Sequence, residues 1–423
     1  MALAGTETDR VVEAVWRIES SRLIGALARV VGDLGLAEDL AQDALLAALQ
    51  QWPTEGVPAR PGAWLMSTAK HRAIDSARRG QRLGAKLEDL GRATSAETDI
   101  DAAIDEGDVG DDLLRLIFTA CHPVIPTSAR AALVLRALGG LTTVEIARAF
   151  LVPVSTVAQR IVRAKRALAE RRVPFEVPDA SERVARLGSV LEIIYLIFNE
   201  GYAATSGDEW MRPALCDEAV RLGRVVAELM PDEPEVHGLV ALMELQSSRL
   251  RARVGPAGQP ILLLDQDRGR WDQLLIGRGL AALERADAGG TAVGSYALQA
   301  RIAACHSRAR TAAETDWPRI AALYGALAVL TPSPVIELNR AMAVAMALGP
   351  LAGLELIDAL AHEPALQAYH LYPSARGDLL AKVGRREEAR AEFERAAGLT
   401  TNEREKTLLL GRAAALAELD GNQ

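Results

Sequence analysis

The sequence predicts an all-α protein, built from two small helical domains, an acidic linker and a larger helical C-terminal domain. Three observations support this fold class. Ala, Leu, Val and Arg dominate the chain and aromatic residues make up only 4% of it, a composition that favours helices. Apolar residues recur at helical spacing in almost every segment. Clusters of Pro and Gly separate these segments, and a chain of 423 residues is long enough for about three domains.

The composition also excludes several classes of protein. Apolar residues (49%) and charged residues (25%) lie near the average for globular proteins. No apolar run approaches the roughly 18 residues that span a bilayer, and the N-terminus is polar and acidic, so we expect a cytoplasmic protein without membrane contact. Cys121, Cys216 and Cys305 lie too far apart for a disulfide framework or a CxxC zinc pattern. We therefore expect buried thiols, no metal and no cofactor.

Charge is strongly segregated along the chain, although the net charge is only −8. The stretch 61–82 carries a net charge of +4, and the stretch 83–112 that follows carries −8. The next stretch, 113–172, carries +8, and residues 173–423 carry −8. Two basic modules joined by an acidic tether and followed by an acidic domain are typical of a protein whose N-terminal part binds nucleic acid.

The expected helices follow from apolar spacing and from breakers. The first part predicts helices over 11–31, 37–52 and 63–79, with Pro53 ending the second and a loop over 53–62. After the linker we expect helices over 112–121, 128–138, 143–150 and 155–172. Pro174 and Pro178 then mark a boundary. Beyond residue 180 the pattern is one of paired helices, except at 254–270, which fits either a small hairpin or an ordered loop.

A repeat signal lies near the C-terminus. Small residues and one aromatic fall at the spacings of a tetratricopeptide (TPR) repeat, namely Gly377, Gly384, Ala389, Phe393 and Ala396. Small residues let the two helices of a repeat approach, while Phe393 fills the groove between neighbours. The stretch 334–360 fits a degenerate neighbouring repeat.

The sharpest motif runs from residue 140 to residue 161 and predicts a helix-turn-helix. Thr142 and Glu145 form a capping box, Ala147 is small enough for a close helix crossing, and Val152-Pro153 makes the turn. The second helix presents side chains that can reach bases and phosphates in a major groove: Ser155, Thr156, Gln159, Arg160, Arg163 and Arg166, with Lys165 beside them. The alternative is a solvated basic helix in a bundle, but the coincidence of cap, turn and cations favours DNA.

Two earlier stretches, 37–52 and 64–79, complete a family pattern. Together with the helix-turn-helix they resemble the extracytoplasmic-function (ECF) group of sigma-70 RNA polymerase sigma factors over residues 10–172. The first stretch resembles the polymerase-binding helix of sigma domain two, the second its promoter-melting and minus-ten-reading helix, and the helix-turn-helix resembles domain four. The segments Cys121-His122-Pro123 and Asn199-Glu200-Gly201-Tyr202 and the TPR-like tail resemble the subgroup with a long C-terminal extension.

The resemblance implies a domain plan and a set of site residues. The plan is domain two over 1–82, the acidic linker over 83–111, domain four over 112–173 and a TPR-like regulatory domain over 180–423. Core RNA polymerase would be contacted through its beta-prime clamp, by Asp39, Gln42 and Asp43, and through its beta flap. Minus-ten DNA would meet Lys70, His71, Arg72, Arg78 and Arg79, and the minus-thirty-five element would meet the second helix of the helix-turn-helix. The loop 53–62 would hold a flipped base.

Two further expectations concern single residues and the C-terminal domain. Trp64, on the apolar side of its helix, fits the core better than a stacking platform for a base. Ala158 stands where many members of the resembled family have Lys. The resemblance therefore does not define which promoter bases the second helix reads. The C-terminal domain would act on the sigma module in cis.

Rival functions find less support. Gly277-Arg278-Gly279 begins a loose GxGxxA, but inside the helical stretch 271–284 rather than after a strand. No phosphate loop or nucleophile elbow occurs, so we expect no enzyme. The Cys-His pairs at 121–122 and 305–306 fit core residues, and the polar segment 265–271 fits an internally paired loop. A one-component helix-turn-helix regulator with a TPR-like sensor remains the alternative, and a TPR scaffold would leave the helix-turn-helix unused.

Overall fold

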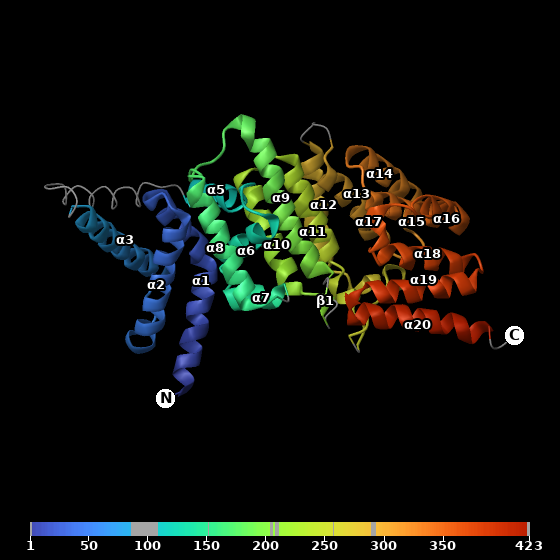
Figure 1. The fold of residues 1–423 in the computed structure, drawn as a ribbon, viewed down its shortest axis with the longest axis horizontal. Helices are drawn as coiled ribbons and strands as arrows, with labels where there is room; N and C mark the ends of the chain where they lie inside the picture. Colours follow the sequence, from blue (N-terminus) through green and yellow to red (C-terminus); the bar gives the residue numbers. More distant parts are fainter. Residues whose placement is uncertain are drawn as a thin grey trace. The chain divides into compact units, whose positions relative to one another are not determined.

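The protein is described by a computed structural model over residues 2–85, 109–150, 152–203, 206–207, 211–256, 258–288 and 293–420. The described chain is almost entirely helical (Figure 1), as the sequence predicts. It forms two compact units, Met1–Ile194 and Tyr195–Gln423. Most of the predicted acidic linker, at 86–108, lies outside the described residues. None of the helices in the described ranges is both long and apolar enough to cross a membrane.

The first unit begins with three helices, α1 (Ala2–Val31), α2 (Leu34–Glu55) and α3 (Pro61–Ala85). Helix α1 ends at Gly32, whose φ of 70° is a left-handed conformation that glycine adopts without strain. Asp33 then caps α2 by accepting a hydrogen bond from the backbone N–H of Leu36 at 2.7 Å. The two helices therefore reverse direction within a few residues and pack together.

The prediction that Pro53 ends the second helix is wrong. Helix α2 runs through Pro53 to Glu55, and Gly56, with a φ of 86°, ends it. Pro53 lies in the last turn, where the helix gives up one backbone hydrogen bond and soon ends in any case. The loop that was expected over 53–62 is consequently confined to 56–60.

The remaining helices of this unit lie close to their predicted positions. They are α5 (Val109–Ala120), α6 (Thr127–Ala137), α7 (Thr143–Ala149) and α8 (Val154–Glu170). The first part of α9 (Ala180–Tyr202), for which no range was predicted, follows them. Helix α5 packs against α1, and α8 packs against α6. Ser189 in α9 accepts a hydrogen bond from Arg130 and donates one to the carbonyl oxygen of Cys121 at 2.8 Å. The start of α9 therefore belongs to the first unit.

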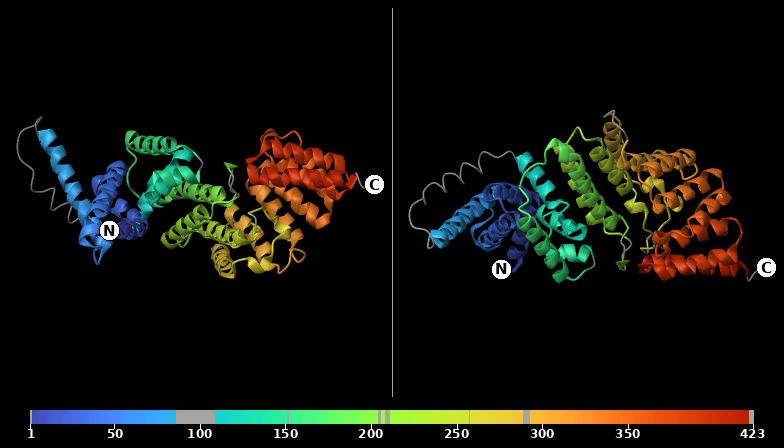
Figure 2. Two further views of the ribbon diagram at one scale, coloured as in Figure 1. Left: turned by 90° about the horizontal axis from the view of Figure 1, so that it is seen from below. Right: turned by 45° about the horizontal axis from the view of Figure 1, so that its top comes forward.

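The second unit consists mainly of paired helices (Figures 1 and 2). Its α-helices are α10 (Pro213–Leu229), α11 (Pro234–Ser247), α12 (Gln273–Ala288), α13 (Ser295–Arg308), α14 (Trp317–Leu330), α15 (Pro334–Leu348), α16 (Pro350–Ala359), α17 (Pro364–Gln367), α18 (Leu371–Lys382), α19 (Arg386–Leu399) and α20 (Glu403–Asp420). Strands β1 (Ser206–Gly207) and β2 (Thr401–Asn402) pair in parallel, with Ser206 opposite Thr401.

The stretch 254–270, for which a hairpin and a loop were both open, is an ordered loop. Val254 and Pro260 form a single antiparallel bridge, and short 3-10 turns follow at Leu263–Asp265 and Arg268–Arg270. The side chain of Asp267 accepts a hydrogen bond from the N–H of Gly269 at 2.9 Å. Segment 265–271 is thus paired internally at Asp267, while Arg268 donates to His306, Ala309 and Thr315 outside the segment.

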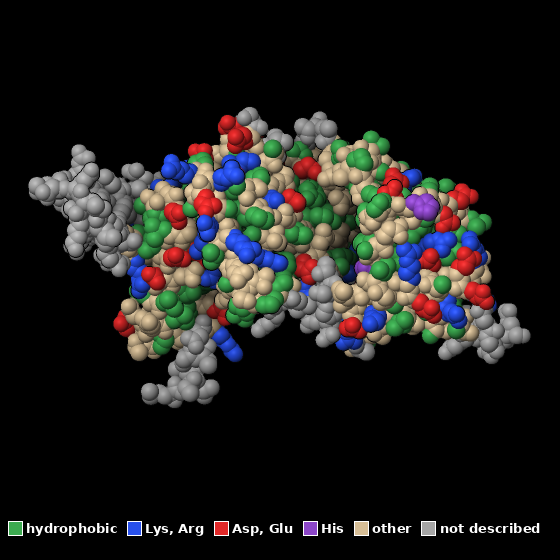
Figure 3. Space-filling view, viewed as in Figure 1, with side chains coloured by type: hydrophobic (Ala, Val, Ile, Leu, Met, Phe, Trp, Pro, Cys, Tyr) green, Lys and Arg blue, Asp and Glu red, His purple; other side chains and the backbone are tan. Residues whose placement is uncertain are grey.

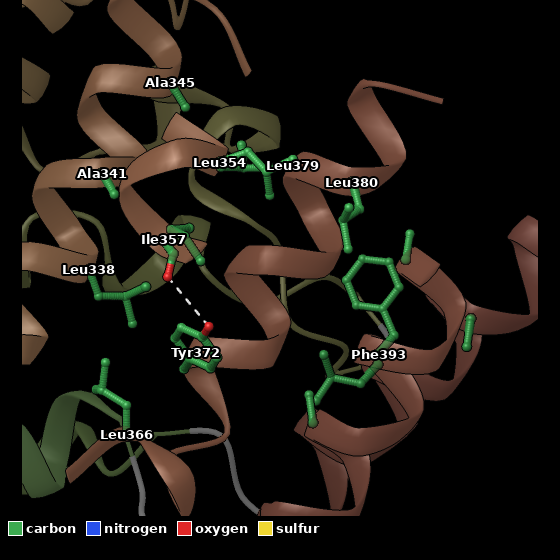
Figure 4. Packing of buried hydrophobic residues seen from close by; sticks show 14 of the residues in the cluster. Leu338, Ala341, Ala345, Leu354, Ile357, Leu366, Tyr372, Leu379, Leu380 and Phe393 are labelled. Atoms are coloured by element: carbon green, nitrogen blue, oxygen red, sulfur yellow. Dashed lines mark hydrogen bonds between the residues drawn. The ribbon is translucent and has the colours of Figure 1, made fainter. Parts of the chain in front are cut away.

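The last helices enclose a hydrophobic cluster, shown in Figure 4. Phe393 is 1% exposed and lies against Gly377, where an added Cβ would come within 3.0 Å of its ring. Gly384 has a φ of 83° and joins α18 to α19 in a tight turn. The small residues and the aromatic therefore have the packing roles expected of them, while the TPR assignment itself stays a prediction.

Candidate functional site

The helix-turn-helix is built by the capping box that the sequence predicts. The backbone N–H of Thr142 donates to Glu145 Oε2 at 2.7 Å, and the N–H of Glu145 donates to Thr142 Oγ1 at 3.1 Å. Burial alone would raise the pKa of Glu145, but hydrogen bonds from Thr142 and Arg17 lower it. The turn is fixed by the N–H of Val152, which donates to the carbonyl of Ala147 at 3.0 Å. The capping box is confirmed.

Helix α8 has one buried face and one face open to solvent. Val157, Ile161, Ala164 and Leu168 are buried. Of the predicted DNA-contacting residues, Ser155, Gln159, Arg163 and Arg166 are exposed, and Thr156 and Arg160 are half-buried. Arg166 donates to Glu170 at 2.6 Å. Since a residue that reads a groove has to be accessible, this face meets the geometric requirement for docking on DNA.

The predicted polymerase-contacting residues lie together on α2. Asp39 is exposed, while Gln42 and Asp43 are half-buried. Gln42 Nε2 donates to Glu38 Oε1 at 2.6 Å, and Asp43 pairs with Arg72 of α3 at 3.2 Å. The acidic face is therefore formed, and part of its charge is already paired within the first unit.

The neighbouring Glu38 holds α2 against the helices that carry the helix-turn-helix. Its side chain is only 3% exposed, and its buried carboxylate is paired with two cations. Arg136 Nε of α6 lies 2.8 Å from Glu38 Oε1, and Lys165 Nζ of α8 lies 2.8 Å from Glu38 Oε2. Lys165 Nζ also lies 3.2 Å from Asp39 Oδ1. We call Glu38, Arg136 and Lys165 the Glu38 clasp. Lys165, which the sequence grouped with the DNA-facing cations, is turned toward α2.

Further contacts tie the same helices together. Arg17 of α1 pairs with Glu145 of α7 at 2.6 Å. Arg29 of α1 pairs with the buried Asp112 of α5 at 2.8 Å. These pairs join residues 128 and 83 positions apart, so the clasp is one of several long-range contacts that hold this unit compact.

The predicted minus-ten residues lie on α3. His71 is exposed, with Nδ1 at 2.7 Å from the carbonyl oxygen of Ser67, and Arg72 pairs with Asp43 as above. Lys70 is half-buried. Arg78 and Arg79 fall in the helix, but their side chains lie outside the described residues. The ring centroid of Trp64 lies 5.4 Å from that of Trp52 in an edge-to-face pair, so Trp64 packs inward as predicted.

The Cys-His pairs show the environment of core residues. Cys121, Cys216 and Cys305 are all buried, and burial raises the pKa of Cys121 and of Cys216 to about 12. Nδ1 of His122 accepts a hydrogen bond from the backbone N–H of Val124 at 3.1 Å. Within the described ranges, no cluster of His, Cys, Asp and Glu has the arrangement of a metal site.

Sequence reasoning missed the clasp. Glu38 lies beside Ala37 and one turn before Ala41, both of which are fully buried. An acidic residue within the apolar stripe of a helix is the signal that could have identified it, because buried carboxylates require cationic or hydrogen-bonding partners. The identity of Arg136 and Lys165 as those partners was not available from spacing.

Comparisons with known families agree with this geometry. Residues 17–83 match the family described as Sigma-70 region 2, and residues 115–168 match Sigma-70, region 4. Residues 186–287 match a family of unknown function (DUF6596). The first match covers the helices with the acidic and basic faces, and the second covers the helix-turn-helix. A chain with both regions has the architecture of a sigma-70 factor.

Similar proteins indicate which group of sigma-70 factors the chain resembles. The uncharacterized protein R00370 of Rhizobium meliloti (strain 1021) is 44% identical over 381 residues, which cover 90% of this chain and 89% of R00370. The ECF RNA polymerase sigma factor SigK of Mycobacterium ulcerans (strain Agy99) is 28% identical over 152 residues, 35% of this chain and 78% of SigK. The probable ECF RNA polymerase sigma factor SigI of Mycobacterium tuberculosis (strain ATCC 25618 / H37Rv) is 28% identical over 178 residues, 41% of this chain and 59% of SigI. No solved structure matches the chain.

The chain thus belongs to the ECF group of sigma-70 RNA polymerase sigma factors and carries a C-terminal extension. The resemblance seen in the sequence is confirmed, and the one-component regulator is not favoured.

Proposed function

We propose that this sigma factor binds core RNA polymerase, recognises the minus-thirty-five and minus-ten promoter elements and has no catalytic activity of its own. It would act in the cytoplasm, where these partners are found. The domain limits that we propose are 1–82 for domain two, 83–111 for the linker, 112–173 for domain four and 180–423 for the TPR-like regulatory domain. The open face of α8 is the observation that supports this proposal most directly.

The site residues take separate roles in this proposal. Asp39, Gln42 and Asp43 would meet the beta-prime clamp, because acidic side chains one turn apart form a face that fits Arg-rich partners. Domain four would contact the beta flap. The α8 residues named above would read the minus-thirty-five element, and Lys70, His71, Arg72, Arg78 and Arg79 would contact minus-ten DNA. The loop 56–60, shorter than expected, would receive the flipped base.

The Glu38 clasp adds a step to this function. While Lys165 lies between Glu38 and Asp39, the acidic face of α2 carries a cation from domain four. A sigma factor has to place domains two and four on separate promoter elements. We therefore propose that binding to polymerase opens the clasp, and that the C-terminal domain modulates this opening in cis.

The experiment is run-off transcription with purified core RNA polymerase on fragmented genomic DNA of the host. We expect discrete new start sites with the protein, and their loss in the charge reversal Asp39→Lys with Asp43→Lys. The matched control reverses the exposed Glu355 and Glu387 of the second unit to Lys, which changes the net charge equally. Start sites that survive the α2 reversal would contradict the assignment of the polymerase face. Specific duplex binding without polymerase and without new transcripts would favour a one-component regulator.

A further inference from the structure

The second unit contains a cavity that the sigma factor function does not use. It has a volume of about 580 Å³ and is lined by residues of α9, α11, α13, α14 and α15. Viewed as in Figure 1, the surface in Figure 3 is hollowed between α11 and α12 on one side and α17 and α18 on the other, with hydrophobic side chains inside the hollow. Cavities of several hundred cubic ångströms are typical sites for small ligands.

The lining divides into an apolar part and a polar part. Leu242, Ile302 and Leu327 contribute apolar surface. Amide and hydroxyl groups come from Asn199, Gln246, Gln299, Tyr324 and Asn339. A few polar groups converging within a mostly apolar enclosure can orient a ligand as well as bury it. The cavity therefore suits an organic molecule with one polar end.

The charge within the cavity is unbalanced. Arg249 lines it and stacks against Trp271 and Tyr202, with its guanidinium carbon 5.6 Å and 5.8 Å from the two ring centroids. It donates one hydrogen bond to the Tyr202 hydroxyl, and its Nε is buried without a partner. No ion pair joins Arg249 to a carboxylate among the described residues. Glu200 is the one described carboxylate in the lining, and it is paired with Arg212.

His306 is a second polar group of the lining with unused hydrogen-bonding capacity. It is 8% exposed, and its Nδ1 is buried without a hydrogen-bond partner. Burial, together with the nearby Arg249 and Arg268, lowers the pKa of His306 to about 3. Arg268 itself donates to the carbonyl oxygens of His306 and Ala309 and to the Thr315 hydroxyl. The imidazole is therefore neutral at pH 7, and Arg249 supplies the positive charge of the cavity.

From these observations we propose that the cavity binds a small organic acid, whose carboxylate meets Arg249 and whose apolar part lies against Leu242, Ile302 and Leu327. Arg249 is half-buried, and its buried Nε lacks a hydrogen-bond partner, so a bound carboxylate would supply both the missing acceptor and a counter-charge. One guanidinium without a carboxylate partner fits a single negative charge, and its planar donors fit a carboxylate. The cavity would make the C-terminal unit a receptor for a metabolite, in addition to the promoter function.

The test uses the full-length protein and a matched pair of probes, 4-fluorobenzoate and the neutral 4-fluorobenzamide, observed by fluorine NMR. We expect saturable binding of the benzoate with a Kd on the order of 1 mM, as suits a ligand of about ten heavy atoms, and at least about tenfold weaker binding of the amide. Arg249→Gln should weaken benzoate binding about tenfold. The control Arg278→Gln removes an exposed arginine of α12 and should leave binding unchanged.

A second variant keeps the proposal testable if Arg249→Gln does not fold. Gln246→Glu leaves Arg249 in place and adds a carboxylate one turn before it on the cavity wall, so the protein would supply its own anion and benzoate binding should be lost. Equal binding of the amide and the benzoate would overturn the proposal, as would benzoate binding that survives in both cavity variants. Failure of the wild-type protein to bind benzoate at tens of millimolar would overturn it too.

Discussion

Glu38 shows how one side chain can join the helices that carry two proposed binding surfaces. Its carboxylate is buried on α2, and its partners come from α6 and α8. We expect Glu38→Gln to lower the free energy of unfolding by about 3–5 kcal/mol, because it leaves Arg136 and Lys165 without their buried counter-charge. Denaturation in urea, followed by circular dichroism, measures this loss.

The neighbouring Asp39 provides the control for that change. Its side chain is 72% exposed, so its pair with Lys165 is largely solvated. Asp39→Asn should cost less than about 1 kcal/mol. If Glu38→Gln and Asp39→Asn lowered the free energy of unfolding equally, burial would not be the reason that Glu38 contributes to stability.

Glu405 gives a prediction for pH. Burial alone would raise its pKa, but hydrogen bonds from His370, at 2.9 Å, and from Thr400, at 2.7 Å, lower it below 4.5. A carboxyl group with a lowered pKa in the folded state stabilises the protein above its unfolded pKa, and this contribution is lost as pH falls through the folded value. We expect wild type to be more stable than Glu405→Gln at pH 6, and the difference to shrink below pH 4.5. Glu403→Gln, at an exposed site on the same helix, should show no such trend.

Among single residues, the sequence predicted those whose roles are local. Thr142 and Glu145 are three positions apart, and their mutual hydrogen bonds follow from that spacing. Arg136 is 98 positions from Glu38, so no periodicity within a helix could pair them. The orientation of Lys165 toward α2, rather than toward solvent, likewise depends on tertiary packing.

At the scale of elements, the capping box sets the start of α7. Thr142→Ala should lower the stability of the helix-turn-helix by about 1 kcal/mol, because the N–H of Glu145 loses its acceptor. The adjacent Thr143→Ala removes a hydroxyl outside the capping box and should cost less. Thermal unfolding of the two variants side by side measures the difference, and a larger loss for Thr143→Ala would contradict this account of the helix start.

The helix pair α18 and α19 depends on its aromatic contact. Phe393 is 1% exposed and packs on Gly377, so Phe393→Ala should destabilise the second unit by about 3–5 kcal/mol through the cavity that it leaves. Val329→Ala removes a side chain that is 84% exposed and should have almost no effect. Calorimetry on the full chain would contradict the prediction if both variants unfolded at the wild-type temperature.

Most helices were predictable because apolar spacing and breakers are local signals, yet α2 shows the limit of such signals. Proline is unfavourable in a helix interior, but at Pro53 the helix needs only two more residues before Gly56 ends it. The form of the 254–270 loop was also open from sequence. It is fixed by long side chains such as Arg268, which reaches carbonyl groups of another helix end.

At the scale of the whole molecule, the clasp can be locked. An added Cβ at Gly35 would lie 3.9 Å from the Cβ of Lys165, a separation that suits a disulfide. We expect the double variant Gly35→Cys with Lys165→Cys to direct no transcription when oxidised and to recover activity under dithiothreitol. The three native cysteines are buried and should not compete.

Each single cysteine variant serves as the control, since neither can form this bond. The proposed opening would be wrong if the oxidised double variant, with its disulfide verified by mass spectrometry, transcribed as well as the reduced one. Loss of activity in both redox states would instead reflect the removal of Lys165. In that case the single variant Lys165→Cys would be inactive as well.

The turn of Lys165 toward α2 also bears on the order in which a transcription complex assembles. A genome offers about a million or more competing non-specific sites to any basic protein. With one cation of α8 held by Glu38 and Asp39, the unassembled protein has less positive charge available for phosphates. Such a molecule would bind non-specific DNA weakly and therefore meet polymerase first. Its full affinity for promoter DNA would develop only in the holoenzyme.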